Sequence, residues 1–264
     1  QVENRGSRPL LLLDGEVVLG ARQHRIFNAT FVVAPEASDL IPVSCVEKSR
    51  WGYQPSSPHP SERQGERNEW RPRERSRNSN EEFTFSGLTF SGARRSRKVE
   101  RVARSVTTTG RYDADQGEVW RDVDQYLERT RVHSRTSAFS DGYVAREEVV
   151  ERALAGVAPE ASQIGFAALH GTKLMTLDLF GSHDLYVRCW KKLMRGVLAE
   201  PLGSAPLAED ASAIVENALG LAANTGLHRK AGPGGGETLH GVREGCALGG
   251  ASFNGVPYHV TLAL

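Results

Sequence analysis

The sequence predicts an α+β fold in which helices pack on a largely antiparallel sheet. Strand-like runs lie next to one another and are joined by tight-turn residues such as Asn254-Gly255, as antiparallel hairpins require. Helix-like runs occur in pairs instead of alternating singly with strands, which argues against a doubly wound parallel sheet. With 264 residues, 39% of them apolar, the chain can bury the core of one large domain.

The N-terminal residues are expected to form a sheet region. Residues 10–13 are four leucines without alternation, which indicates a strand covered on both faces. Asp14-Gly15 predicts a hairpin turn into a second strand, because a type I′ turn needs positive φ at both central residues. Residues 26–33 predict a third strand, and residues 41–47 predict a fourth.

A polar stretch separates this region from the rest of the chain. Residues 54–82 hold six arginines and six glutamates, with Trp70 as their one large apolar side chain. Such a segment buries too little apolar surface to offset its ordering entropy. We expect a flexible insertion that a protease would cut first, between the N-terminal sheet region at 1–53 and the remainder of the same domain at 83–264.

The remainder predicts strands and helices in pairs. Apolar residues at four-residue spacing predict one helix through Val119 and Leu127, and a stripe through Tyr186 and Trp190 predicts another, with Trp190 in the core. The other expected elements are a strand at 83–90, a helix at 143–155, a hairpin at 163–180, an alanine-rich helix within 207–225 and a last hairpin about Asn254-Gly255.

A basic run follows the strand at 83–90. Residues 94–104 contain six basic residues and one acidic residue, without an interleaved aromatic side chain. A run of this kind is more often a solvated face than a nucleic-acid site. Because the formal net charge of the chain is +1, no overall field attracts nucleic acid, and we do not expect it as a partner.

Polar residues at the ends of the first strands are the main candidate ligand site. The set consists of Arg22, Gln23, Arg25, Glu47, Arg50 and Trp51. An arginine fork binds phosphate or carboxylate bidentately, and glutamine can contact a ribose hydroxyl or an amide. If these side chains converge, they suit a phosphorylated sugar. The alternative is that arginine–glutamate pairs close the ends of the sheet.

Acidic residues and a cysteine in the same region are candidates for chemistry. Asp14 and Glu16 are two residues apart, so a strand would place both carboxylates on one face. There they could hold a metal or, with Glu47, do acid–base work. The alternative for Asp14 is ordinary turn chemistry. Cys45 lies in a predicted strand, where cysteine is more often a small buried hydrophobe than a nucleophile.

No metal or cofactor motif is present in the sequence. The eight histidines lack zinc-site spacing, and the three cysteines, an odd number without CxxC spacing, fit a reducing cytoplasm. His259 lies on the polar face of an alternating strand, so we expect it to be solvated. The glycines at 232–236 lack the Lys-Ser/Thr of a phosphate-binding loop and predict a flexible linker. No apolar run approaches the roughly 20 residues that span a bilayer. The chain opens without methionine, so we expect an N-terminal piece to be missing.

Three motifs carry a resemblance to a known family. They are LLLDGE at 11–16, GARQHR at 20–25 and IPVSCVEKSRW at 41–51, with weaker likeness at 115–120, at 177–180 and in the last hairpin. The chain resembles the domain family named for its association with ADP-ribosylglycohydrolases and rhodanese-type phosphatases. In this chain His24 stands between Gln23 and Arg25, where the family pattern has asparagine.

The resemblance implies a link to NAD and ADP-ribose metabolism. On the first hypothesis, the chain binds a nucleotide-like or ADP-ribose-like ligand and acts on it as a hydrolase. On the second, it is a non-catalytic regulatory or partner-binding domain whose charged residues are structural. Convergence of Asp14, Arg22, Arg25 and Glu47 in one pocket favours the first hypothesis, and their dispersal favours the second.

Overall fold

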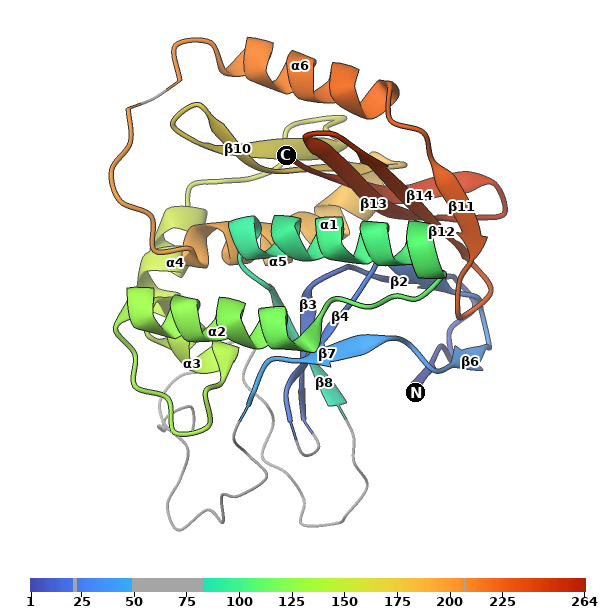
Figure 1. The fold of residues 1–264 in the computed structure, drawn as a ribbon, viewed down its shortest axis with the longest axis horizontal. Coiled ribbons are helices and arrows are strands. Elements are labelled where there is room, and N and C mark those ends of the chain that lie inside the picture. Colours follow the sequence, from blue (N-terminus) through green and yellow to red (C-terminus); the bar gives the residue numbers. More distant parts are fainter. Residues whose placement is uncertain (21–22, 49–82, 207) are drawn as a thin grey trace.

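Helices and sheets alternate in layers across the molecule (Figure 1). The computed structural model describes residues 1–20, 23–48, 83–206 and 208–264. From the top of Figure 1 downward, the layers are α6, a six-stranded sheet, the helices α1 and α5, and the N-terminal strands with α2. The predicted α+β fold with antiparallel sheets is confirmed.

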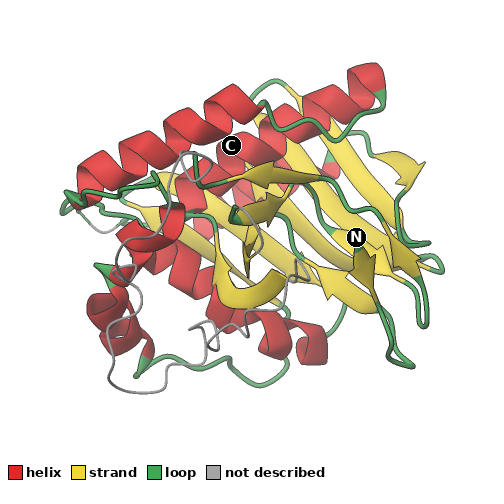
Figure 2. Cartoon of the chain, turned by 90° about the horizontal axis from the view of Figure 1, so that it is seen from below, coloured by secondary structure: helices red, strands yellow, loops and turns green. Residues whose placement is uncertain are grey.

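The six-stranded sheet is antiparallel throughout, in the order β11-β12-β13-β14-β10-β9. Its strands are β9 (Gly165–His170), β10 (Lys173–Phe180), β11 (His228–Ala231), β12 (Glu237–Arg243), β13 (Cys246–Phe253) and β14 (Val256–Ala263). Both predicted hairpins, β9–β10 and β13–β14, are confirmed. Asn254 and Gly255 have φ angles of 51° and 76°, which is the positive pair that a type I′ turn needs. In Figure 2 the strands of this sheet run side by side, with helices along them.

The N-terminal strands form three smaller antiparallel sheets. A four-stranded sheet has the order β7-β4-β3-β8 and contains β3 (Glu16–Gly20), β4 (Arg25–Phe27), β7 (Val43–Cys45) and β8 (Phe83–Thr89). The two-stranded sheets pair β2 (Leu10–Leu12) with β5 (Phe31–Val33) and β1 (Val2–Glu3) with β6 (Ser38–Asp39).

The expected hairpin at Asp14-Gly15 is wrong, although the turn itself is present. β2 pairs with β5, whereas β3 pairs with β4 and β8, so the two strands that flank the turn belong to different sheets. Gly15, with φ of 71°, donates to Phe27 O at 2.8 Å, and its carbonyl accepts from Phe90 N at 2.7 Å. The turn therefore connects β2 of one sheet to β3 of another. The run at 26–33 likewise splits into β4 and β5.

Six helices lie in the part of the chain that the structure describes. They are α1 (Gly92–Thr109), α2 (Gln116–Thr130), α3 (Phe139–Val144), α4 (Glu147–Leu154), α5 (His183–Ala199) and α6 (Ala211–Ala223). The helix expected at 143–155 is two short helices. The predicted amphipathic helices are α2 and α5, and α2 begins where Asp115 accepts from Glu118 N at 3.2 Å. Trp190 is partly buried between two core clusters.

The helix α1 lies between the large sheet and the N-terminal strands. Its Val99 packs on Ala247 and Ala263 of the large sheet, and its Val102 and Val106 join the core of the N-terminal region. On the other face of the large sheet, α6 packs against Leu248 and its neighbours. The middle strands are therefore covered on both faces. None of the helices among the described residues is long and apolar enough to cross a bilayer.

This position of α1 overturns two sequence expectations. Arg94, Arg95 and Lys98 are buried, so the basic run is not simply a solvated face. His259 is 1% exposed, because the face of β14 that looks polar in sequence lies against α1 and the N-terminal strands.

The glycine-rich stretch packs against β5 and is not a free linker. Gly234, with φ of 87°, accepts from Ala34 N at 2.7 Å and donates to Asp39 Oδ2 at 2.8 Å. A Cβ at this position would lie 3.0 Å from the Cα of Val33. Glycine is therefore required for the close approach of this loop to β5. The expected insertion at 54–82 lies outside the described residues.

Candidate functional site

The motif residues gather into two clusters that lie on different elements. The charged core cluster lies between α1, the large sheet and the turn after β2, and consists of Asp14, Arg95, Lys98, Asp178 and His259. The sheet-end cluster lies across β4, β7 and the start of α2, and consists of Gln23, Arg25, Cys45, Glu47 and Gln116.

Arg95 is at the centre of the charged core cluster. Its Nη1 and Nη2 donate to the two carboxylate oxygens of Asp178 at 2.9 and 2.8 Å. Nη2 also donates to Asp14 Oδ1 at 2.5 Å, and Nε donates to the Asp14 carbonyl at 3.1 Å. One guanidinium thus joins α1 to the LLLDGE turn and to β10, and all three residues are at most 2% exposed.

Lys98 and His259 complete this cluster. Lys98 Nζ donates to Asn28 O at 2.8 Å and lies 3.4 Å from Asp14 Oδ2. His259 Nε2 is 2.8 Å from Asp178 Oδ1, and its Nδ1 is 3.1 Å from Thr30 Oγ1. Its two ring nitrogens thus contact a carboxylate on one side and a hydroxyl on the other.

The cations of this cluster hold its two carboxyl groups in their ionised forms. Burial alone would raise the pKa of Asp14, but the charges of Arg95 and Lys98 outweigh it and lower that pKa below its usual value. The same balance between burial and Arg95 lowers the pKa of Asp178 well below its usual range. Burial lowers the pKa of Lys98 to about 8, against the opposing attraction of Asp14. These groups therefore form a paired internal network.

Glu16, the other carboxylate of the LLLDGE motif, forms a separate, partly buried ion pair. Glu16 Oε1 accepts from Lys192 Nζ of α5 at 2.6 Å, and Glu16 Oε2 accepts from Leu13 N at 3.2 Å. Asp14 and Glu16 do not share a partner, because the turn at Gly15 and the start of β3 direct them to different helices. Both motif carboxylates are buried, at 2% exposure.

The order Thr30–His259–Asp178 resembles the hydroxyl–imidazole–carboxylate arrangement of hydrolases. Each of the three side chains is at most 1% exposed, however, and the carboxylate is already bound by Arg95. A nucleophile has to meet its substrate, and this hydroxyl lies in the interior. The arrangement therefore ties β14 to β10 and to the N-terminal region.

The sheet-end cluster closes the edge of the four-stranded sheet. The Gln116 side chain accepts from Cys45 N at 2.8 Å and donates to Cys45 O at 2.9 Å, so the amide takes the place of a further strand. Gln23 Nε2 donates to Glu47 O at 2.9 Å, and Glu47 Oε2 accepts from His24 N at 3.1 Å. Glu47 is fully buried.

Arg25 differs from Arg94 and Arg95, which each pair with a carboxylate. Its Nη1 contacts Cys45 Sγ, and Cys45 Sγ lies 3.3 Å from Gln23 Oε1. Arg25 is half-buried, yet it forms no ion pair with a carboxylate among the described residues. Burial raises the pKa of the Cys45 thiol despite the nearby charge of Arg25, so the thiol does not neutralise that charge.

Exposed apolar side chains lie on the same face of the sheet as Arg25. Directly opposed residues place Phe85 beside Val18, Val18 beside Arg25, and Arg25 beside Cys45. Phe83 and Val43 extend this face at its two edges. The exposed fractions of Val43, Phe83 and Phe85 are 39%, 43% and 45%. We call these three residues with Arg25 the Arg25 patch.

The structure separates the candidate residues that the sequence grouped together. Gln23, Arg25 and Glu47 meet in the sheet-end cluster, whereas Asp14 and Glu16 lie in the interior with partners on α1 and α5. Arg22, Arg50 and Trp51 lie outside the described residues. Among the residues that are described, no group of three or more His, Cys, Asp or Glu is placed to hold a metal ion.

Sequence reasoning missed Arg95, Lys98 and Gln116. A signal for Arg95 exists: it continues the stripe of Val99, Val102 and Val106 toward the start of α1, and so occupies a core position of that helix. For Gln116 the sequence offers only the weak family likeness at 115–120, and it is the fold that brings the side chain to β7.

One family model matches the chain over residues 1–263, and its description is ARPP-1, the ARG and Rhodanese-Phosphatase-superfamily-associated Protein domain. The chain belongs to this family. The resemblance in the three N-terminal motifs is thereby confirmed at the level of the family. No curated protein and no solved structure gives a match. The stretches around Asp14, around Asp178 and in the last hairpin, which carry the resemblance in sequence, meet in the charged core cluster.

Proposed function

We propose that this chain is a non-catalytic, partner-binding domain that acts together with proteins of the ARG or rhodanese-phosphatase superfamilies. The observation that carries the proposal is the Arg25 patch, in which three exposed apolar side chains share a sheet face with a half-buried guanidinium that has no carboxylate partner among the described residues. Aromatic residues and arginine are enriched in protein interfaces, whereas monomeric surfaces rarely keep large apolar groups together. The family description, which names associated proteins, supports the same function.

The position of the motif carboxylates also supports a non-catalytic domain. Asp14 pairs with the buried Arg95, Glu16 pairs with the partly buried Lys192, and Glu47 accepts from the backbone N–H of His24. A general acid or base must come within hydrogen-bond distance of its substrate. All three carboxylates are at most 2% exposed, so their interactions stabilise the fold.

The chemistry of the patch defines the partner surface. An apolar segment would cover Phe83, Phe85 and Val43, and a carboxylate beside it would bind the guanidinium fork of Arg25. Such an ion pair becomes stronger when the interface excludes water. Since the guanidinium is already partly desolvated in the free protein, binding adds less desolvation cost.

Titration calorimetry with a purified rhodanese-type phosphatase and a purified ADP-ribosylglycohydrolase tests this proposal. We expect saturable binding to one of them, and we expect Arg25→Glu and Phe85→Ser each to weaken it at least tenfold, as losses at the centre of an interface do. The matched controls are Lys191→Glu on the exposed surface of α5 and Val157→Ser, whose side chain is 46% exposed. Equal affinities of the patch variants and the controls would contradict the proposal.

A second candidate function is binding of a nucleotide-like or ADP-ribose-like ligand, on which the chain would act as a hydrolase. The observation that favours ligand binding is the same guanidinium, which pairs with no carboxylate among the described residues, together with the Gln23 amide oxygen 3.3 Å from Cys45 Sγ. A diphosphate needs at least one such fork. Thermal shift with ADP-ribose, NAD and simple nucleotides is the test, because a ligand of the folded state raises its melting temperature. A shift that Arg25→Ala removes favours this function, and no shift excludes it.

A further inference from the structure

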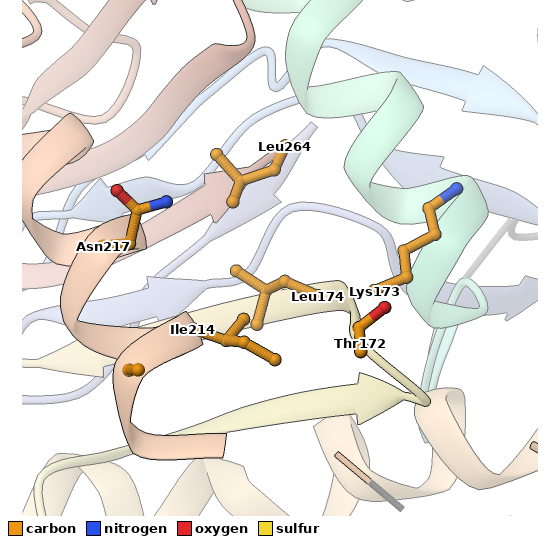
Figure 3. A pocket seen from close by; sticks show the side chains of 7 residues that line it. Thr172, Lys173, Leu174, Ile214, Asn217 and Leu264 are labelled. Atoms are coloured by element: carbon orange, nitrogen blue, oxygen red, sulfur yellow. The ribbon is translucent and has the colours of Figure 1, made fainter. Parts of the chain in front are cut away.

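The large sheet has an open edge at β9. Among the described strands, β9 pairs with β10 alone and stands at one end of the strand order. Both faces of the β9–β10 hairpin are covered. On one face Leu174 of β10 packs with Ile214 of α6 (Figure 3), and on the other Phe166 of β9 joins the core cluster that contains Tyr186 and Leu193 of α5. The open part of β9 is therefore its backbone edge.

The two edges of this sheet differ in length and charge. β11, at the opposite edge, has four residues and carries Arg229, whose side chain is 51% exposed. A short, charged edge strand is protected against pairing with another chain. β9 has six residues, all half-buried, and contains no Lys, Arg, Asp, Glu or Pro. An edge strand with these properties is suited to pair with a further strand.

The hydrogen bonds to β10 show which backbone groups of β9 face outward. Phe180 N donates to Ile164 O at 2.8 Å, and in an antiparallel ladder every second residue after Ile164 then bonds toward β10. The N–H and C=O groups of Gly165, Ala167 and Leu169 are consequently directed away from β10. Those of Ala167 and Leu169 have no partner in the part of the chain that the structure describes.

Contacts at its two ends bound the open edge. At the start, Gln163 Nε2 donates to Gly165 O at 2.7 Å, which leaves that carbonyl one further lone pair. At the hairpin end, His170 Nε2 lies 2.8 Å from Gly203 O, in the loop after α5. Ala167 is therefore at the centre of the open edge.

β9 is complementary to itself in antiparallel pairing. With Ala167 opposite Ala167 of a second copy, the outward backbone groups of both strands form hydrogen-bonded pairs. The same register sets Phe166 opposite Ala168 and Leu169 opposite Gly165, so each large side chain meets a small one. No like charges face one another between these residues.

Exposed apolar side chains flank this edge. Ile164, which precedes β9, is 48% exposed. His183 Nδ1 lies 2.7 Å from Gln163 O, so the start of α5 lies beside the start of β9. Val187, 43% exposed, follows one turn later on the same side of α5. A stable dimer buries about 800 Å² per partner, and these side chains add apolar area to the strand pair.

We propose that the β9 edge binds a second copy of this chain. In the dimer, the two large sheets join across antiparallel β9 strands, and the two-fold axis passes between the two Ala167 residues. The match of large with small side chains belongs to the strand paired with itself, and it assigns the edge to a second copy instead of a peptide of another sequence. The edge shares no residue with the Arg25 patch and does not depend on the proposed function.

Sedimentation velocity of the full chain over a range of concentrations tests the proposal, and we expect a monomer–dimer equilibrium. Ala167→Pro removes an N–H that makes no bond to β10, so it should keep the fold and weaken dimerisation by about tenfold or more. Ala167→Lys should also weaken it, because two like charges then lie opposite each other. Val157→Lys, at a position that is 46% exposed, is the matched control.

Cysteine variants test the register. The Cα atoms of a hydrogen-bonded pair are about 5.5 Å apart, which a disulfide can span. Under oxidation, Ala167→Cys should therefore give a dimer linked through position 167, identified by peptide mass spectrometry. Ala168→Cys should not, because Phe166 lies opposite. The parent chain, with its three cysteines, gives the background.

Four outcomes would overturn the proposal. The first is a chain that stays monomeric at every concentration. The second is dimerisation that survives both Ala167→Pro and Ala167→Lys in variants whose melting curves match the parent. The third is cross-linking of Ala168→Cys in place of Ala167→Cys. The fourth is a dimer that Arg25→Glu abolishes, which would assign it to the Arg25 patch. We expect Arg25→Glu to leave dimerisation unchanged, so failure of this edge and failure of the proposed function are distinguishable.

Discussion

Arg95 of α1 and Asp178 of β10, 83 residues apart, form a buried bidentate ion pair with N–O distances of 2.8 and 2.9 Å. The pair fixes the central helix to the large sheet. Because Arg95 also binds Asp14, the same guanidinium connects the sheet to the first motif of the chain. A buried cation between two carboxylates is stable only while both remain, since each charge compensates the desolvation of the others.

Asp178→Asn should therefore destabilise the protein strongly. Removing one charge of a buried pair costs about 3–5 kcal/mol in the free energy of unfolding, because the remaining partner stays buried without full compensation. Asp184→Asn is the matched control, since Asp184 pairs with Arg188 on the surface, with side chains 70% and 55% exposed. An exposed, solvent-screened pair of this kind contributes far less to stability than a buried one. Urea denaturation measures both. Equal losses would show that the charged core cluster is solvated in solution.

The burial of His240 leads us to expect a loss of stability in acid. Its two ring nitrogens have no hydrogen-bond partner in the described structure, and burial, reinforced by the charges of His228 and Lys230, lowers its pKa to about 4. The unfolded chain has a histidine pKa near 6.5, so between these values the unfolded state binds more protons. Stability therefore falls as pH drops through this window, by about 2 kcal/mol between pH 7 and pH 5.

The variant His240→Phe should remove this part of the pH dependence. Urea denaturation at pH 7 and pH 5 gives the slope, and the exposed His133→Phe serves as the control that should leave it unchanged. The lowered pKa of Asp178 acts in the same direction at lower pH, where the carboxylate protonates. An unaltered slope in His240→Phe would mean that His240 is protonated without cost in the folded protein.

Removing the Gln116 side chain should loosen the edge of the sheet at β7. Its amide satisfies both backbone groups of Cys45, which lie half-buried at the end of the four-stranded sheet. Gln116→Ala leaves these groups unpaired, and we expect a loss of about 1–3 kcal/mol. Hydrogen exchange of the Cys45 amide should accelerate, while that of Val102 in α1 should not. An unchanged Cys45 amide would show that solvent or another group replaces the glutamine.

The sequence predicts those elements whose signals are local. The last hairpin follows from Asn254-Gly255, and α2 and α5 follow from their apolar spacing, because turn chemistry and helical periodicity are read within a few residues. The charged core cluster is not local. Arg95 meets Asp14 and Asp178 from more than 80 residues away, and no spacing along the chain records that contact.

The alternation of polar and apolar residues in β14 gave a wrong prediction for His259, and the reason is physical. In a sheet with one solvated face, polar residues mark the face toward water. Here α1 and the N-terminal strands cover that face of β14, so Thr261 and His259 are buried as well as Leu262. Polar residues on such a face must be paired inside the protein, and His259 is paired with Asp178 and Thr30. The sequence indicated the strand but not what covers it.

Substitutions at Arg25 and at Glu47 should affect binding and the free energy of unfolding differently. Arg25 is half-buried and makes no carboxylate contact in the described residues, so Arg25→Ala should change the free energy of unfolding by less than about 1 kcal/mol. Glu47 is fully buried and accepts from His24 N. Glu47→Ala leaves that N–H without its acceptor, and we expect it to lower the free energy of unfolding by about 1–3 kcal/mol. Glu47→Gln keeps an acceptor in place and should lower it by less.

The binding measurements then decide what Arg25 does. If the guanidinium contacts a partner or a ligand, Arg25→Ala should weaken that binding, and Arg25→Lys should restore little of it, because a lysine ammonium cannot replace the bidentate fork. Glu47→Gln should bind nearly as the parent does, since its carboxylate faces the interior. Loss of binding in Glu47→Gln with full binding in Arg25→Ala would assign the contact to the carboxylate instead and would refute the role proposed for the Arg25 patch.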